Sequence, residues 1–430
     1  MAFQQGLSGL DASASQLNTI GNNIANASTV GFKSSNTQFS DIIASAFNGA
    51  GSTSSGIGTQ VSRISQSFTQ GNIQSTGNSL DMAINGQGFF RMNNNGNITF
   101  TRNGQFQLDK NGYLVDAAGN QVTGYLAASN GTIVAATPTP IQIPTANLAP
   151  TPTTQATVGV NLDSSATPPT TTPFNPNDPT TFNNSTSVTV YDSLGNSHIA
   201  SLYFVQNPVT SHPTPPVTAS WTTYLTVDGT SVPAVVPPAS PTPIGTLGFN
   251  ASGTLVSPPA ATTPTPLQTG QIAVSLPPAN GAAAQAITMS FGNSTQYGSP
   301  FGVNQLVQNG YTSGQLSGFT TSATGIIQGN YSNGQSKNLG QIALANFADP
   351  QGLQSLGNNQ WGESFNSGAA LIGAPSSGNL GAIQSGAVEG SNVNLTSELV
   401  NMITAQRNYQ ANAQTIKTED QITQTLINLR

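Results

Sequence analysis

The side chains that most often carry out chemistry in proteins are scarce in this sequence. Cysteine is absent, which excludes disulfides, thiolate zinc sites and cysteine nucleophiles. The two histidines, His198 and His212, belong to no metal-ligand spacing such as His-x-x-x-His, and we interpret both as solvent-facing loop residues. The adjacent acids Glu419 and Asp420 point about 100° apart on a helix, so they cannot flank one substrate atom.

Glycine-containing motifs do not supply a site either. Gly86 and Gly88 precede Phe89 and Phe90 instead of opening a helix, which argues against a phosphate-binding loop. The two Asp-x-x-Gly units at 109–112 and 116–119 could belong to calcium loops, but they lack the carboxylate ladder and bidentate Glu of an EF-hand. We predict that they are hairpin turns. The sequence therefore predicts no catalytic residue, no cofactor, no metal and no enzymatic activity.

Regular apolar spacing at both chain ends is more informative. Steps of three and four residues predict helices with one narrow stripe, typical of a coiled-coil seam. The N-terminal stripe comprises Phe3, Leu7, Leu10, Ala14, Leu17, Gly21 and Ile24. The C-terminal stripe comprises Leu395, Leu399, Met402, Gln406, Tyr409, Ala413 and Ile416 and, after a slip of one residue, Ile422, Leu426 and Leu429. Each stripe needs a partner, which is the other chain end or a neighbouring copy; two helices lying on one ordinary domain are the alternative.

Composition limits the class of protein. Charged residues make up 6% of the 430 residues, against about 25% in an average protein, so copies can approach one another with little repulsion. The net charge of −6 argues against a nucleic-acid partner. No apolar run is long enough to predict membrane insertion. The N-terminus lacks the basic and apolar regions of a signal peptide, so we expect export without a cleaved signal peptide.

The middle of the chain predicts a multidomain, mainly β protein. Asn-Gly turns between alternating runs predict hairpins, and Pro-rich segments predict a small β-domain with long loops. The order of elements is nearly palindromic, which predicts nested, discontinuous β-domains and a terminal α-helical coiled-coil domain made from both ends. We expect four parts: residues 1–30 with 391–430 as the coiled coil, 31–78 with 358–390 as an extended connector, 79–145 with 285–357 as an inner β-domain, and 146–284 as an outer Pro-rich β-domain.

Several motifs carry a family resemblance. Residues 22–33, Asn-Asn-Ile-Ala-Asn-Ala-Ser-Thr-Val-Gly-Phe-Lys, resemble the N-terminal signature of bacterial flagellar rod and hook proteins. Residues 80–90 and 101–106 are similar to the first β-domain of that family, and residues 390–395 and 402–411 resemble its C-terminal signature. The signature positions are Asn22, Asn23, Asn26, Gly31, Phe32, Lys33, Asn392 and Arg407. Residues 189–196, 310–314, 332–334 and 340–347 resemble the hook members; the Pro-rich parts of 137–285 lie outside the resemblance.

The resemblance implies a structural role. Many copies would form a curved helical tube that acts as a universal joint, transmits torque from rod to filament and encloses the export channel, with the terminal helices as its inner wall. The implied partners are other copies, the distal rod, the hook cap, the hook–filament junction protein and the flagellar type III export apparatus. The implied location is the hook and basal body on the cell exterior. Phe39 and Ile43 resemble an export-gate pattern, which amphipathic packing explains equally well.

Two alternatives remain. A distal rod subunit of the flagellar basal body would form a straight, stiff polymer, which electron micrographs would distinguish from a curved one. A surface adhesin or glycan-binding β-protein with helical anchors would bind its ligand through the central domain alone and form no polymer.

Overall fold

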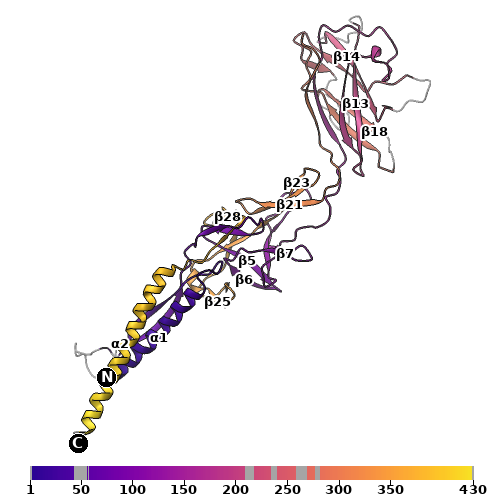
Figure 1. Ribbon diagram of the computed structural model, residues 1–430. Helices are drawn as coiled ribbons and strands as arrows, with labels where there is room; N and C mark the ends of the chain where they lie inside the picture. The colour runs from indigo at the N-terminus through magenta and orange to yellow at the C-terminus, as the bar shows by residue number, and fades with distance from the viewer. Residues whose placement is uncertain are drawn as a thin grey trace. The chain divides into compact units, whose positions relative to one another are not determined.

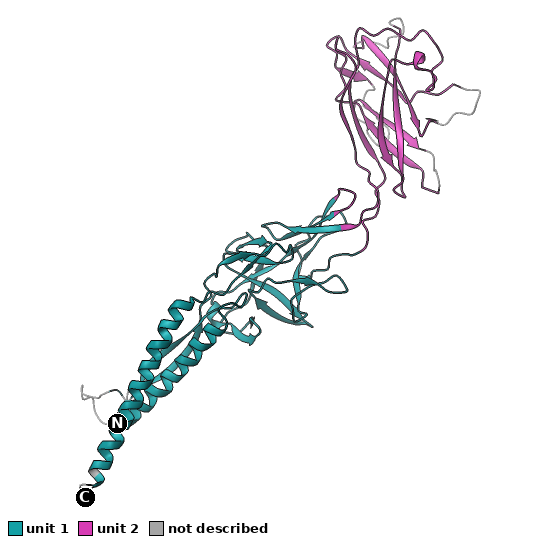
Figure 2. Ribbon diagram, in the orientation of Figure 1, with its two compact units in different colours: residues 1–145, 317–330, 336–430 teal, residues 146–316, 331–335 magenta. Residues whose placement is uncertain are grey.

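The chain folds into two compact units (Figure 2). The computed structural model describes residues 2–42, 56, 58–208, 217–233, 240–257, 269–276 and 281–428. Unit 1 comprises residues 1–145, 317–330 and 336–430, and unit 2 comprises residues 146–316 and 331–335. Unit 2 is therefore inserted between two parts of unit 1, and both ends of the chain belong to unit 1.

The described residues contain two α-helices, one near each end of the chain. Helix α1 (Ala2–Ala25) and helix α2 (Leu395–Asn428) lie side by side and run in opposite directions (Figure 1). Helix α2 has 34 residues and α1 has 24, and α2 continues past the N-terminus of α1. The side chain of Asn394 accepts a hydrogen bond from the backbone N–H of Ser397 at 3.1 Å and caps the start of α2.

A hairpin packs against α1. Strands β1 (Ser35–Ile42) and β2 (Gly58–Gln66) are antiparallel, with a bulge between Gln38 and Phe39. The hydroxyl of Thr37 donates to that of Thr19 at 3.0 Å, which fixes the hairpin to the helix. We expected residues 31–78 to be an extended connector. Strands β1 and β2, which lie within this range, instead form an antiparallel pair that packs against α1. Most of the Gly/Ser-rich segment between β1 and β2 lies outside the described residues.

Two short ladders join the outgoing chain to the returning chain. Strand β3 (Ile73–Ser75) pairs with β29 (Ala387–Glu389), and β4 (Met82–Asn85) pairs with β28 (Ala382–Ser385), both antiparallel. Segments about 300 residues apart in sequence thus lie next to each other just beyond the helix pair.

The larger sheet of unit 1 has thirteen strands among the described residues. Its main path is β21-β22-β23-β9-β5-β6-β26-β25. The strands are β5 (Phe89–Asn94), β6 (Asn97–Thr101), β7 (Gln107–Leu108), β8 (Leu114–Val115), β9 (Gln121–Leu126), β10 (Thr139–Pro140), β21 (Leu316–Thr321), β22 (Ile326–Tyr331), β23 (Ser336–Ile342), β24 (Leu344–Asn346), β25 (Gln354–Gly357), β26 (Gln360–Gly362) and β27 (Leu371–Gly373). A cluster of buried aromatic rings forms part of its core, in which Phe89 meets both Phe347 and Trp361 edge to face.

The Asp-x-x-Gly units are hairpin turns, as predicted. The backbone N–H of Gly112 donates to the carbonyl of Asp109, and that of Gly119 donates to the carbonyl of Asp116, both at 3.0 Å. One carboxylate oxygen of each aspartate also accepts backbone N–H groups two and four residues further on. Both glycines have φ near +84°, a conformation that favours glycine over other residues.

Unit 2 is a β-sandwich in which two sheets share one core. One sheet has the order β12-β13-β14-β16-β17, with β15 beside β14, and the other has the order β18-β19-β11-β20. The elements are β11 (Gln155–Asn161), η1 (Pro179–Thr181), β12 (Asn184–Tyr191), β13 (Ser197–Gln206), β14 (Ala219–Val227), β15 (Thr230–Val232), β16 (Gly245–Phe249), β17 (Leu255–Ser257), β18 (Gln271–Leu276), β19 (Gln285–Ser290) and β20 (Gly302–Gln308). Side chains from both sheets, including Phe204, Trp221 and Met289, are buried in the shared core.

Residues 285–316 belong to unit 2, although the sequence pattern grouped them with the inner β-domain. Strands β19 and β20 both pair with β11, the first in parallel and the second antiparallel. Alternation predicts a strand but not its partner, so this boundary required the three-dimensional pairing. The prediction of a mainly β chain whose two terminal helices pack together is confirmed.

Candidate self-assembly site

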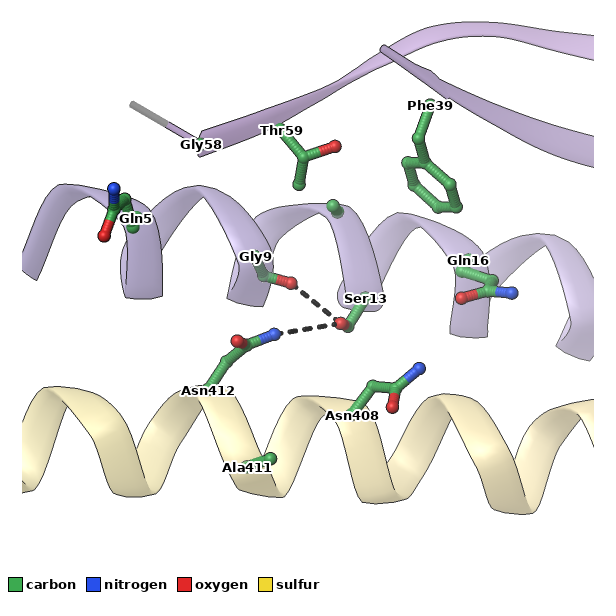
Figure 3. A pocket seen from close by; sticks show the side chains of 11 residues that line it. Gln5, Gly9, Ser13, Gln16, Phe39, Gly58, Thr59, Asn408, Ala411 and Asn412 are labelled. Atoms are coloured by element: carbon green, nitrogen blue, oxygen red, sulfur yellow. Dashed lines mark hydrogen bonds between the residues drawn. The ribbon is translucent and has the colours of Figure 1, made fainter. Parts of the chain in front are cut away.

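The contact between α1 and α2 is made by small residues. A Cβ atom on Gly6 would lie 3.0 Å from Cγ1 of Ile416, and one on Gly9 would lie 2.7 Å from Nδ2 of Asn412. The hydroxyl of Ser13 donates to the carbonyl of Gly9 at 2.7 Å and accepts a long hydrogen bond of 3.5 Å from Asn412 (Figure 3). The helices approach this closely because glycine and serine occupy the facing positions.

A hollow of about 540 Å³ lies between the two helices and the β1–β2 hairpin (Figure 3). Polar side chains such as Gln16 and Asn408 line it, together with Phe39. Phe39, which we singled out for export, is 42% exposed on β1, while Ile43 lies outside the described residues. The contact of α1 with its neighbours is therefore partly open, and both polar and apolar side chains line the open part.

The close approach at Gly9 gives a testable prediction. We expect Gly9→Leu to lower the free energy of unfolding of the helix pair by about 1–3 kcal/mol, because the side chain would enter the space of Asn412. Gly21→Leu is the matched control, since no described atom outside the surrounding backbone of α1 lies within 4 Å of its Cβ position, and a gain of up to about 1 kcal/mol in helix propensity is expected there. Thermal unfolding followed by circular dichroism measures both. Equal effects of the two substitutions would contradict the close contact.

The predicted stripe of α1 lies beside this contact and not within it. On a helix of about 3.6 residues per turn, the stripe is centred about 80° from the face of Gly6, Gly9 and Ser13. Phe3 and Leu7 are 52% and 46% exposed. The remaining stripe residues are partly covered: Leu10, Ala14, Leu17, Gly21 and Ile24. Much of the apolar surface of α1 therefore faces away from α2.

The predicted stripe of α2 is covered only in part. Met402, Ala413 and Ile416 are half-buried, and Ala405, which is fully buried, is not one of the stripe residues. The exposed stripe residues are Leu395, Leu399, Gln406, Tyr409 and Ile422. Leu429 and the side chain of Leu426 lie outside the described residues.

Together the two helices expose a large set of apolar side chains. These are Phe3, Leu7, Leu395, Leu399, Val400, Ile403, Ile422 and Ile427. Many exposed apolar side chains on one pair of helices favour a contact with another molecule. The helix pair is therefore the strongest candidate for a binding surface in the described part of the chain.

Asn23 fixes α1 to its surroundings. Its side chain is 1% exposed, accepts from the backbone N–H of Ser35 at 2.9 Å and donates to the carbonyl of Ser35 at 2.8 Å. The same amide group donates to the carboxylate of Glu398 on α2 at 3.3 Å. One signature side chain thus connects α1, β1 and α2, and so holds the helix pair at a fixed place on the hairpin.

Lys33 belongs to a buried charge cluster at the base of the helices. Its ammonium donates to Glu389 Oε1 at 2.6 Å and to the carbonyl of Thr69 at 2.7 Å. Arg102 donates to Glu389 Oε2 at 3.0 Å and to the carbonyl of Gly86 at 2.9 Å. Burial lowers the pKa of both Lys33 and Arg102, and the charge of Glu389 opposes this shift. We call Lys33, Arg102 and Glu389 the charge cluster.

The segment before Lys33 is fitted to this cluster. The backbone N–H of Gly31 donates to the carbonyl of Glu389 at 2.8 Å. Gly31 has φ of +71°, and a Cβ atom there would lie 2.6 Å from the backbone nitrogen of Asn103. A side chain at this position is therefore excluded by both conformation and space.

The other signature residues have different surroundings. Asn392 accepts from the backbone N–H of Ser34 at 2.7 Å and donates to the carbonyl of Ser67 at 2.8 Å, which connects the start of α2 to the hairpin. Asn26 donates to the carbonyl of Asn22 at 3.0 Å near the end of α1. Phe32 is buried, and Asn22 and Arg407 are exposed, so the structure does not bring those two into the junction.

Sequence reasoning missed Arg102, Glu389 and Glu398 as partners of the signature residues. A signal was present, because charged residues are only 6% of the chain and each is therefore unusual. Arg102 lies inside the motif at 101–106, and Glu389 directly precedes the motif at 390–395. What the sequence lacks is any indication that residues more than 280 positions apart meet.

His198 is not the solvent-facing loop residue that we expected. Its side chain is 13% exposed, and its Nδ1 lies 2.6 Å from Asp228 Oδ2 and its Nε2 lies 3.4 Å from Asp192 Oδ2. The hydrogen bond to Asp228 raises the pKa of His198, burial acts against it, and Asp192 adds to the rise. Burial alone would raise the pKa of Asp192, but hydrogen bonds from Asn196, His198 and backbone N–H groups lower it to about 2. His212 lies outside the described residues.

This arrangement predicts a pH dependence in unit 2. A raised histidine pKa means that the contribution of protonated His198 to stability is fully present below about pH 6.5 and is lost as the pH rises through the raised pKa. We expect less than about 1 kcal/mol, because Asp228 is half exposed. Titration of the histidine ring by NMR, assigned with His212→Gln, should give a midpoint above about 6.5 that falls in Asp228→Asn. An unchanged midpoint in Asp228→Asn would contradict the assigned contact.

The described residues contain no group of three or more His, Asp or Glu side chains arranged to hold a metal ion.

Among the helices described, none is long and apolar enough to cross a membrane.

Models of known protein families match the chain in four places. The model for flagella basal body rod protein matches residues 3–33, and that for the FlgE/F/G D1 domain of flagellar hook protein matches residues 83–163. The D2 domain of flagellar basal body protein FlaE matches residues 161–311, and the C-terminal model of flagellar basal body rod FlgEFG protein matches residues 384–429. The first and last of these coincide with the helix pair and its junction.

Similar proteins match the chain over its whole length. Flagellar hook protein FlgE of Escherichia coli is 44% identical and that of Salmonella typhimurium is 43% identical, each over 100% of both chains. The crystal structure of Helicobacter pylori flagellar hook protein FlgE2 is 15% identical, covers 74% of this chain and 100% of that chain, and has a TM-score of 0.49. With full-length identity above 40% to two hook proteins, the chain belongs to the flagellar hook protein family.

Proposed function

We propose that this chain is the structural subunit of a flagellar hook and that it polymerises through its terminal helices. The observation that carries the proposal is the exposed apolar surface of α1 and α2, with Phe3, Leu7 and Leu399 each close to half exposed. Exposed apolar side chains on a helix gain about 25 cal/mol per Å² when a neighbour covers them. Other copies of the chain are the simplest neighbour, because the same surface is present on every copy.

The type of contact favours a helical polymer. The exposed residues of α1 and those of α2 form different surfaces, so a contact between α1 of one copy and α2 of the next joins unlike patches. Contacts of this kind build open helical assemblies when the rotation between copies does not close a ring. The low content of charged residues, 6%, reduces repulsion between closely packed copies.

We assign the parts of the chain to layers of this polymer. The helices in residues 1–30 and 391–430 form the inner wall around a channel. Residues 31–78 and the returning strands β28 and β29 connect them to the β-domains, whereas β26 and β27, within the expected connector 358–390, belong to the larger sheet of unit 1. The inner and outer β-domains form the outer layers. The separate cores of the two units support a joint that can bend, because each unit keeps its own packing while copies slide.

The polymer is a curved tube on the cell exterior that acts as a universal joint between rod and filament and encloses the export channel. Its partners are the distal rod, the hook cap, the hook–filament junction protein and the flagellar type III export apparatus, which receives the chain without a cleaved signal peptide. Full-length identity of 44% to a flagellar hook protein supports these claims.

Deleting residues 393–430 tests the proposal. We expect the shortened chain to form no polymer, while unit 2 stays folded because its core lies entirely within residues 156–291. Electron microscopy at matched concentrations measures polymer, and fluorescence of the buried Trp221 reports on unit 2. Tubes that persist after the deletion would contradict the proposal, and a straight polymer of the full chain would indicate a distal rod subunit instead.

A further inference from the structure

Phe365 is an aromatic side chain placed in full contact with solvent. It lies in the turn between β26 and β27, and its exposure is the highest among the large apolar residues of the described chain. Leaving an aromatic ring in water forgoes about 1.5–3 kcal/mol of burial free energy. A single exposed ring is ordinary on a flexible loop, which can move and bury the ring. A ring on a fixed turn stays exposed.

The turn that carries Phe365 is held in place by its neighbours. Ser367 is fully buried; its hydroxyl donates to the carbonyl of Ser364 at 2.9 Å and accepts from the backbone N–H of Ser364 at 2.9 Å. The hydroxyl of Ser364 donates to the carbonyl of Gly352. A Cβ atom on Gly352 would lie 2.4 Å from the carbonyl carbon of Asn366, so the turn rests directly on that backbone. The ring is therefore presented outward by a rigid support, which is the arrangement of an interface anchor.

The same unit carries a pocket that fits such a ring. It has a volume of about 600 Å³, and its lining includes Phe68, Phe89, Phe347, Ala348 and Arg102. Phe68 and Phe89 meet edge to face with ring centres 5.5 Å apart. An apolar cavity of about 150 Å³ is enough to hold benzene, so the pocket accepts a phenylalanine ring with room for neighbouring atoms.

Charge matches the two surfaces as well. Arg102 lines the pocket with its guanidinium carbon 5.3 Å from the centre of the Phe89 ring, and its Nε is buried with no hydrogen-bond partner among the described residues. The cluster behind it places two cations, Lys33 and Arg102, against one carboxylate, Glu389, so it carries surplus positive charge. The turn of Phe365 carries the exposed acid Glu363 two residues earlier.

We propose that the turn of Phe365 on one copy docks into the pocket of Phe68, Phe89 and Arg102 on a neighbouring copy. The ring of Phe365 packs against the rings of Phe68 and Phe89, and Glu363 approaches Arg102. Within one copy the turn borders the pocket, because Gly368 lies against Ala348, so the contact joins adjacent parts of unit 1 on two copies. The inference rests on the proposed function, since it adds a second contact between copies to the one that the terminal helices make.

Cysteine pairing tests this contact directly, because the chain has no cysteine of its own. One population of chains carries Phe365→Cys and a second carries Ala348→Cys at the pocket, and the two are assembled together under mild oxidation. We expect a covalent dimer on a non-reducing gel from the mixture, and none from either variant assembled alone. Lys110→Cys replaces Phe365→Cys as the control for chance collisions. A second arm compares Phe365→Ser with Phe365→Trp, and we expect the serine variant alone to need at least about tenfold more protein to polymerise.

The outcomes separate this inference from the proposed function. If wild-type chain forms tubes but the mixture gives no more dimer than the Lys110→Cys control, the docking contact is wrong and the hook subunit assignment stands. Polymerisation of Phe365→Ser at the wild-type concentration would overturn the contact in the same way. If the wild-type chain forms no polymer, both proposals fail.

Discussion

Replacing Glu389 by glutamine is expected to lower the free energy of unfolding of unit 1 by about 3–5 kcal/mol. Glu389 is fully buried, and its carboxylate accepts from the ammonium of Lys33, the guanidinium of Arg102 and the backbone N–H of Gly71. The substitution leaves two buried cations without the negative charge that compensates them. A buried charge that loses its partner keeps its full desolvation cost, which explains the size of the effect.

Denaturant unfolding followed by tryptophan fluorescence measures this loss. Trp361 lies in the core of unit 1, so a Trp221→Phe background confines the signal to that unit. Glu419→Gln removes the same charge from α2, away from the cluster, and is expected to change stability by less than about 0.5 kcal/mol. Adding Lys33→Met to Glu389→Gln should recover part of the loss, because one unpaired cation then remains in place of two. A loss below about 1 kcal/mol in Glu389→Gln would show that the cluster is not a source of stability.

Introducing a charge into the exposed apolar surface of the helices should prevent assembly without unfolding the chain. We expect Leu7→Asp and Leu399→Asp each to raise the protein concentration needed for polymerisation by more than about tenfold, since about 1.4 kcal/mol corresponds to a factor of ten. Both leucines are 46% exposed, so the isolated chain should unfold at the wild-type temperature. In a polymer each would place an unpaired carboxylate between apolar helices.

Leu126→Asp is the matched control, because Leu126 is 43% exposed on β9 and lies outside the helices. Sedimentation at a series of concentrations gives the threshold for each variant, and circular dichroism confirms that the chain is folded. Wild-type thresholds for both helix variants would contradict a role of this surface in assembly. Equal loss in all three variants would instead indicate a general effect of added negative charge.

The sequence predicted the helices and the turns well because their signals are local. Steps of three and four residues identified α1 and α2, and Asp-x-x-Gly identified the hairpin turns. Local patterns also predicted that both chain ends are helical and meet. They did not predict the face of α1 that meets α2, because Gly6 and Gly9, which face Ile416 and Asn412, lie outside the stripe that the larger apolar residues of α1 define.

The partners of the signature residues depend on distant parts of the chain. Asn23 pairs with Glu398 across 375 positions, and Lys33 pairs with Glu389 across 356 positions. No periodicity in the sequence spans such distances, and a single charged residue does not indicate which distant residue it pairs with. His198 shows the same limit, because its position after a turn predicted exposure while two aspartates from separate turns enclose it.

The account depends most on the exposed helix surfaces being covered by other copies of the chain. An electron cryomicroscopy map of the assembled polymer tests this claim most directly. We predict that Phe3, Leu7 and Leu399 are buried against helices of neighbouring copies in the map. A tube in which these side chains face solvent, with neighbouring copies joined through their β-domains alone, would contradict the account.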